Sequence, residues 1–225
     1  MQNLRNIDKQ SMLSQDLGEL LTEAIVQGVI PQGSKISEPE LARRYGVSRG
    51  PLREAMLKLE GIGLVERIPH VGARVVELNC QQLLDIYTIR EPLEGMACRL
   101  AAERLTQRQL NELHDLLEHH QQYLDDNHGE AYFDQQGDFD FHYRIIKATG
   151  NQRLVTLLCD ELYHLLRMYR STSARQHARP KRALQEHWAI WQALNDRDGE
   201  LAEILMRRHI SRARKVIEQL SSPDS

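Results

Sequence analysis

The fold is decided by residues 37–60, which read Ser37-Glu-Pro-Glu-Leu-Ala-Arg-Arg-Tyr-Gly-Val-Ser-Arg-Gly-Pro-Leu-Arg-Glu-Ala-Met-Leu-Lys-Leu-Glu60. Ser37 and Glu40 have the spacing of a capping box, in which each side chain bonds the backbone amide of the other, so a helix is expected to begin here. Gly46 can adopt the left-handed conformation that ends a helix, and Ser48 can cap a second one. Two short helices joined by a tight turn are therefore predicted.

The second of these helices has an apolar stripe and a polar N-terminal end. Its stripe consists of Leu52, Ala55, Met56 and Leu59, and the outward side chains at its start are those of Ser48, Arg49 and Arg53. A recognition helix presents its N-terminal residues to the major groove of DNA in this way. Two arginines on an exposed helix face are also common as solvated charge, so the neighbouring sequence has to decide.

Residues 61–76 and the local charge favour DNA binding. This stretch contains two β-rich runs around a turn from Pro69 to Gly72, which predicts a hairpin wing after the helix-turn-helix. Between Arg43 and Arg74 the basic residues outnumber the acidic ones, although the whole chain has a formal net charge of -3. The span is thus locally cationic, which suits contact with a phosphate backbone.

This region resembles the winged helix-turn-helix of the GntR family of bacterial transcription regulators. The resemblance rests on the runs Ile30-Pro-Gln-Gly-Ser-Lys-Ile-Ser-Glu38, Val47-Ser-Arg49, Leu52-Arg-Glu-Ala-Met56, Gly63-Leu-Val65 and Gly72-Ala-Arg-Val75. It implies that Ser48, Arg49 and Arg53 contact DNA from the recognition helix, and that His70 to Gly72 form a wing tip that enters the minor groove. We add Arg43, from the same cationic span, to the expected contacts.

Length and composition set the frame for the rest of the chain. Its 225 residues suffice for two domains, and the low aromatic fraction together with abundant Leu, Ala, Glu and Arg predicts a mostly helical protein. The polar N-terminus does not read as a signal peptide, and no apolar run approaches the length needed to span a bilayer. The three cysteines are widely spaced without a CxxC pair, which suits reduced thiols. We expect a cytoplasmic protein without membrane contact.

The predicted fold class is mainly α, with a winged helix-turn-helix of three helices and a β-hairpin over residues 1–78 and an antiparallel helical bundle over 79–225. Leu17, Leu21 and Ile25 mark the first helix of the winged domain. In the bundle, helices are expected near 80–103, 106–126, 130–148, 152–172, 181–195 and 198–220. The core of such a bundle is a usual place for a ligand or metal site.

Several polar side chains of the bundle occupy positions that should face its core. Asp138 and His142 are four residues apart on one predicted helix, with Cβ atoms about 5–6 Å apart. His187 and His209 each lie among apolar residues of the last two helices. Together they could hold Zn²⁺ or a similar divalent ion, although a side-chain hydrogen bond and satisfied core histidines are the alternative. The remaining histidines, expected to be mostly solvated, are His114, His119, His120, His128, His164 and His177.

Arg90 is also expected to face inward, because it follows Leu83 and Tyr87 at helical spacing. A buried guanidinium needs an anion. A salt bridge to Glu94, four residues further on, is one possibility. A carboxylate ligand, which can accept two parallel hydrogen bonds from the guanidinium, is the other.

The second part of the chain resembles the helical effector domain of the FadR subfamily, called FCD. The matching runs are Asp85-Ile-Tyr-Thr-Ile-Arg-Glu-Pro-Leu-Glu94, Leu100-Ala-Ala-Glu-Arg104, Asp138-Phe-Asp-Phe-His-Tyr-Arg-Ile-Ile-Lys-Ala-Thr-Gly-Asn151, Glu186-His187 and Met206-Arg-Arg-His209. In members that bind metal, an aspartate and three histidines are the ligands, and Asp138, His142, His187 and His209 match them. The resemblance also implies a small carboxylate that completes the coordination and meets Arg90. Tyr87 and Asn151 are further candidate effector contacts. For Asn151, the alternative role is to cap a helix.

These observations lead to the hypothesis of a homodimeric, ligand-responsive transcription factor, most simply a repressor, that binds a palindromic operator in double-stranded DNA. Zn²⁺ is the expected ion, with Ni²⁺ or Mn²⁺ as alternatives, and a di- or tricarboxylate is the expected effector. A metal sensor without an organic effector, in which Arg90 only pairs with Glu94, remains open. A metalloenzyme is a further alternative, but the chain has no HExxH helix, so enzyme activity is not expected.

Overall fold

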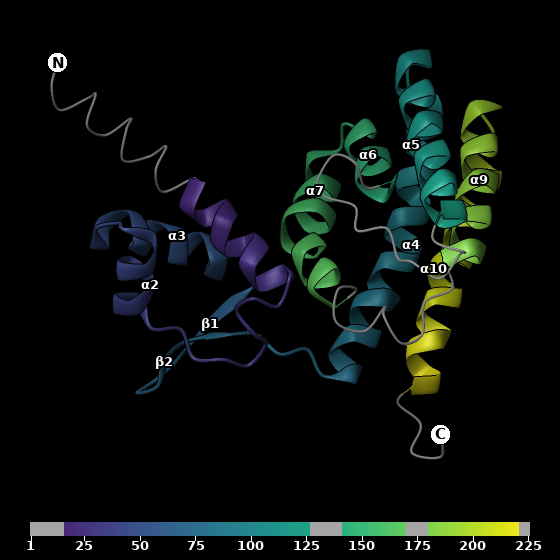
Figure 1. Ribbon diagram of the computed structural model, residues 1–225. Helices are drawn as coiled ribbons and strands as arrows, with labels where there is room; N and C mark the ends of the chain where they lie inside the picture. The colour runs from purple at the N-terminus through teal and green to yellow at the C-terminus, as the bar shows by residue number, and fades with distance from the viewer. Residues whose placement is uncertain (1–15, 127–140, 170–179, 221–225) are drawn as a thin grey trace, which may run out of the picture. The chain divides into compact units, whose positions relative to one another are not determined.

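The computed structural model describes residues 16–126, 141–169 and 180–220. These residues belong to two compact units. The first unit contains the residues up to Glu77 and the stretch 160–169, and the second contains Leu78–Cys159 and 180–220. The predicted fold class is confirmed, since helices dominate and a β-hairpin lies in the first unit (Figure 1). Within the described ranges, no helix is long and apolar enough to cross a membrane.

The first unit builds a small helical core against a hairpin. It contains a helix over 16–26, then α2 (Glu38–Tyr45), α3 (Arg49–Gly61), β1 (Val65–Ile68) and β2 (Gly72–Val75), and a helix over 163–169. The strands are antiparallel, with Val65 opposite Val75 and Ile68 opposite Gly72. The predicted stripe of α3 is buried, because Leu52, Ala55, Met56 and Leu59 are each at most 2% exposed.

Gly46 ends α2 as predicted, but the side-chain cap predicted at the start of α2 is not formed. Gly46 has a φ of 64° and ends α2, and α3 begins directly after Ser48. The capping box predicted for Ser37 and Glu40 is not formed, although Ser37 is the N-cap residue. The amide of Glu40 donates to the carbonyl oxygen of Ser37 at 3.0 Å, so it is satisfied without the serine hydroxyl.

The second unit is a helical bundle. Its helices are α4 (Cys80–Arg104), α5 (Gln107–Asp126), α6 (Phe141–Ala148), α7 (Gln152–Val155), α9 (Pro180–Asn195) and α10 (Gly199–Leu220). α10 packs along α4, and α5 packs against α9. The approach of α4 and α10 is close at Gly95, where an added Cβ would lie 2.6 Å from Cγ of Arg207. The bundle thus brings α4, α6, α9 and α10 near one another.

The helix predicted over 152–172 is interrupted. The chain forms α7 and then a π-helical turn over Thr156–Glu161, and a further helix covers 163–169. The side chain of Asn151 caps α7 by accepting hydrogen bonds from the amides of Arg153 and Leu154. Hydrophobic periodicity cannot separate such pieces, because the apolar positions of α- and π-helical turns nearly coincide over so short a length.

Candidate metal centre and nucleic-acid interface

Three buried histidines meet inside the bundle. His142 comes from α6, His187 from α9 and His209 from α10, and each is at most 9% exposed. The Nε2 atom of His187 lies 3.2 Å from Nε2 of His142 and 3.3 Å from Nε2 of His209. A ligand nitrogen of each ring lies within 4.8 Å of the other two. The three rings therefore direct their nitrogens at one small volume.

Apolar packing positions these rings. His142 follows the buried Phe141 and precedes the buried Ile145 and Ile146, so the inner face of α6 carries the imidazole into the core. The ring of Phe141 stacks on that of His187 with centroids 4.6 Å apart. His209 lies directly before the buried Ile210 on α10. The helical spacing that predicted inward histidines is confirmed at all three positions.

Two carboxylates fix the orientation of two of the rings. Nδ1 of His142 lies 2.6 Å from Oε2 of Glu94, and Nδ1 of His209 lies 2.7 Å from Oε2 of Glu186. A carboxylate only accepts hydrogen bonds, so in the neutral imidazole the proton sits on Nδ1 and the lone pair on Nε2. Histidine ligands of metals commonly donate their other ring N–H to a carboxylate in this way.

The spacing and the donor set fit a divalent cation. Nitrogen ligands about 2.0–2.1 Å from a tetrahedral Zn²⁺ lie about 3.3–3.4 Å from each other, close to the 3.2 and 3.3 Å found here. With their protons on Nδ1, His142 and His209 direct Nε2 lone pairs into this buried volume, where a cation can bind them. Asp138, the fourth ligand expected from the sequence, lies outside the described residues.

Arg90 is buried beside this cluster and is only partly satisfied. Its side chain is 2% exposed, and its Nε donates to Oε1 of Glu94 at 2.5 Å. Nη1 of Arg90 is buried and has no hydrogen-bond partner among the described residues. The guanidinium lies over the ring of the buried Tyr87, 4.8 Å from its centroid. Both Tyr87 and Arg90 thus face inward as the sequence predicted.

Glu94 joins Arg90 to the histidine cluster. Burial acts to raise the pKa of this carboxyl, but the charges of Arg90 and His142 and their hydrogen bonds hold the pKa well below its usual range. The ionised carboxylate receives Arg90 on one oxygen and His142 on the other. The sequence suggested the pair with Arg90 and missed the contact with His142.

Asn151, the third residue expected to contact an effector, caps α7, and its contact with an effector stays a prediction. Its side-chain Oδ1 accepts hydrogen bonds from the backbone amides of Arg153 and Leu154. The backbone amide of Asn151 donates to the hydroxyl of Thr149. These contacts all lie within one turn of chain. Glu186 was not singled out from the sequence, and only its position next to His187 could have suggested a role.

Several of the other histidines differ from the expectation of solvated side chains. His120 is 3% exposed, and His114 packs edge-on against Trp188 and Trp191. His164 is half-buried, and burial together with the charge of Arg167 lowers its pKa to about 4. The rings of Trp188 and Trp191 on α9 pack against His114 of α5, and single-helix periodicity does not reveal such a contact between helices. His128 and His177 lie outside the described residues.

The start of α3 offers free polar groups. Ser48 is the N-cap residue but makes no capping hydrogen bond, so its hydroxyl is available. Arg49 and Arg53 are exposed, as is Arg43 near the end of α2. None of the described residues forms an ion pair with these three arginines. The N-terminal end of α3 therefore presents a hydroxyl and two guanidiniums, which is the donor set that reads phosphates and guanine edges.

The tip of the hairpin adopts a tight conformation. His70 has a φ of 64° and Gly72 a φ of 103°, and the amide of Val71 donates to the carbonyl oxygen of Ile68. Positive φ is unusual for a residue with a Cβ, so the turn holds His70 in a strained form. His70, Val71 and Gly72 are all exposed, as a tip that enters a groove requires.

Comparison with known proteins assigns the family. Residues 13–75 match the model of the bacterial regulatory proteins of the gntR family, and residues 85–212 match that of the FCD domain. The chain belongs to the GntR family of transcriptional regulators, in the FadR-like subfamily that carries an FCD domain. It is a DNA-binding regulator and not an enzyme.

Individual relatives cover nearly the whole chain. It is 26% identical to the HTH-type transcriptional repressor RspR of Escherichia coli K12, over 95% of this chain and 92% of that protein. It is 28% identical to the Uxu operon regulator of Haemophilus influenzae, over 97% of this chain and 86% of that protein. The structure of E. coli McbR/YncC is similar with a TM-score of 0.71 at 23% identity, over 93% of this chain and 99% of that one, which shows the fold.

Proposed function

We propose that this regulator is a cytoplasmic, homodimeric repressor whose affinity for a palindromic operator is controlled by a small carboxylate bound at a metal ion. Residues 1–78 would read DNA, and residues 79–225 would bind the effector and form the dimer. The family and the relative named as a repressor support DNA binding.

In the DNA-reading part, Arg49 and Arg53 distinguish bases in the major groove, and Ser48 and Arg43 contact phosphates. His70 and Gly72 at the hairpin tip enter the minor groove. The exposure of all six residues supports these roles. Each domain of a dimer reads one half of the operator, because two-fold symmetry of the protein requires two-fold symmetry of the site.

In the effector domain, His142, His187 and His209 hold the ion, with Asp138 as a fourth ligand. Zn²⁺ suits this nitrogen and oxygen donor set, and Ni²⁺ or Mn²⁺ is the alternative. The observation that carries the proposal is the convergence of three Nε2 atoms beside a buried guanidinium whose Nη1 has no hydrogen-bond partner among the described residues. A di- or tricarboxylate would bind the ion with one group and Arg90 with another, while Tyr87 packs beside it.

The effector can change DNA affinity only if it binds one arrangement of the dimer better than the other. Thermal shift of the untagged protein with a panel of small organic acids, before and after chelation and return of Zn²⁺, tests the proposal. An acid at about 100 times its Kd adds about 2.7 kcal/mol of stability. We expect this gain only with metal present, and the same acid should release operator DNA. A gain that is equal without metal contradicts the proposal.

A metal sensor is the second candidate, and the pair between Arg90 and Glu94 favours it. Because Nε of Arg90 already donates to Glu94, the guanidinium has an internal anion. Operator affinity that follows free metal and ignores all of the acids would support the sensor. Operator release by one acid at constant free metal would exclude it.

A further inference from the structure

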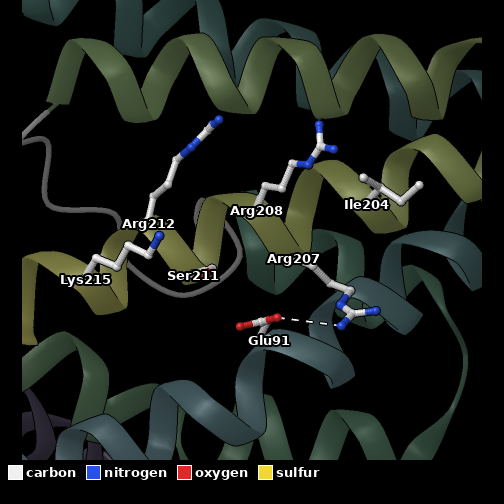
Figure 2. Close-up of a pocket in the computed structure, with 7 residues that line it drawn as sticks. All are labelled: Glu91, Ile204, Arg207, Arg208, Ser211, Arg212 and Lys215. Atoms are coloured by element: carbon white, nitrogen blue, oxygen red, sulfur yellow. Dashed lines mark ion pairs between the residues drawn. The ribbon is translucent and has the colours of Figure 1, made fainter.

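The outer face of α10 carries a basic groove that none of the three histidines lines. Its volume is about 420 Å³, which is in the range of about 300–1,000 Å³ typical of small-molecule sites. The groove is lined by Glu91 of α4 and by residues of α10, among them four basic ones (Figure 2). These four are Arg207, Arg208, Arg212 and Lys215.

Among the described residues that line this groove, four are basic and one is acidic. Arg207 lies 3.7 Å from the carboxylate of Glu91, and Arg212 donates to Oε1 of Glu186 at 3.1 Å. Within the described part of the chain, no ion pair is formed by Arg208 or Lys215. Figure 2 shows Arg208 and Arg212 extending to the same side of α10, while Arg207 turns toward Glu91. Arg208 and Lys215 thus have no counter-charge among the residues that the structure describes.

The helical spacing concentrates this charge. Arg208 and Arg212 are four residues apart, and Lys215 follows three residues later, so all three lie on one face of α10. Like charges at this spacing repel each other, and an exposed helix more often alternates acids and bases there. Ser211, which also lines the groove, adds a hydroxyl between the cations. An anion bound among these donors would relieve the repulsion.

We propose that this groove binds a small phosphate-bearing anion, either inorganic phosphate or a phosphate monoester, independently of the metal. A phosphate offers three or more acceptor oxygens and up to two negative charges. It can therefore accept from two guanidiniums, an ammonium and a hydroxyl at once. A single carboxylate has only two oxygens, and one guanidinium satisfies both.

Isothermal titration with inorganic phosphate at fixed ionic strength tests this site on the full chain. The test variant is Arg208→Ala/Lys215→Ala, whose side chains are exposed, so that the fold is retained and circular dichroism can verify it. The matched control is Arg108→Ala/Lys181→Ala, which removes one exposed arginine and one exposed lysine outside the groove. Glycerol 3-phosphate, titrated in parallel, distinguishes an ester from free phosphate as the better ligand.

We expect saturable binding to the wild type and the control, weakened by about tenfold or more in the test variant, because charge-assisted hydrogen bonds are lost. His187→Ala should bind phosphate like the wild type. Equal phosphate binding by the test variant and the control would overturn the proposal. So would loss of phosphate binding in His187→Ala, since the phosphate would then lie on the metal. Failure of the carboxylate proposal leaves these expectations unchanged.

Discussion

Oε2 of Glu186 lies 2.7 Å from Nδ1 of His209, although the two residues come from different helices. The same relationship holds between Glu94 and His142 at 2.6 Å. Each carboxylate also accepts a hydrogen bond from an arginine. Arg90 donates to Glu94, and Arg212 donates to Glu186 at 3.1 Å. Charged residues behind the histidine cluster therefore fix the direction of Nε2 in His142 and His209.

Replacing Glu186 with glutamine should weaken metal binding. The amide keeps the size of the side chain but lacks the negative charge. That charge makes Nε2 of His209 a stronger electron-pair donor to the metal. We expect the affinity for Zn²⁺ to fall by about 10–100-fold, the range for mutation of such outer partners. Competition with a fluorescent chelator measures this affinity. Glu200→Gln, at an exposed site paired with Arg99, is the control, and an affinity equal to that of this control would refute the role of Glu186.

Replacing Arg90 with alanine should destabilise the metal-free protein. It leaves the buried carboxylate of Glu94 without its cation, and breaking one side of a buried ion pair costs about 3–5 kcal/mol. Urea unfolding of the chelated protein measures the loss. Arg108→Ala breaks an exposed pair with Glu112 and should cost less than about 1 kcal/mol. A loss for Arg90→Ala as small as that of the control would show that Glu94 needs no counter-charge.

Replacing Arg49 with alanine should abolish preference for the operator while leaving the effector domain unchanged. A bidentate contact with a base is worth about 1–3 kcal/mol of discrimination. Mobility-shift titrations with specific and scrambled DNA measure the ratio of affinities, and thermal shift with Zn²⁺ verifies the second unit. An unchanged ratio of affinities would mean that Arg49 does not read bases.

The stability of the protein should fall in mild acid because of His164. Its pKa is about 4 in the folded chain and 6.5 in an ordinary environment, owing first to burial and then to Arg167. The unfolded chain thus takes up the proton first, and the stabilisation present above about pH 6.5 is lost as the pH falls to about 4. This contribution is at most about 3 kcal/mol. In His164→Gln, the urea midpoint should depend less on pH over this window, and an unchanged slope would count against the prediction.

The positions of the histidines were predictable because each lies on a helix with a clear apolar face. His142 precedes Ile145 and Ile146, and His209 precedes Ile210, so periodicity alone directs both rings inward. The recognition helix was predictable because its apolar stripe and its N-cap residue, Ser48, lie close together in the sequence.

The partners of the histidines were not predictable in this way. The contact of Glu94 with His142 spans 48 residues, and that of Glu186 with His209 spans 23 and joins two helices. Both depend on how the helices pack. The capping box at Ser37 was predicted but is not formed, although its residues are close in sequence. A backbone carbonyl can accept from an amide that the sequence assigns to a side chain.

The central claim is that His142, His187 and His209 together hold a divalent ion. Elemental analysis of the untagged protein, after loading with Zn²⁺ and gel filtration, tests it most directly beside His187→Ala and the exposed-site control His119→Ala. The account predicts about one equivalent per chain in the wild type and the control, and far less in His187→Ala. A full equivalent retained by His187→Ala, or none bound by the wild type, would contradict it.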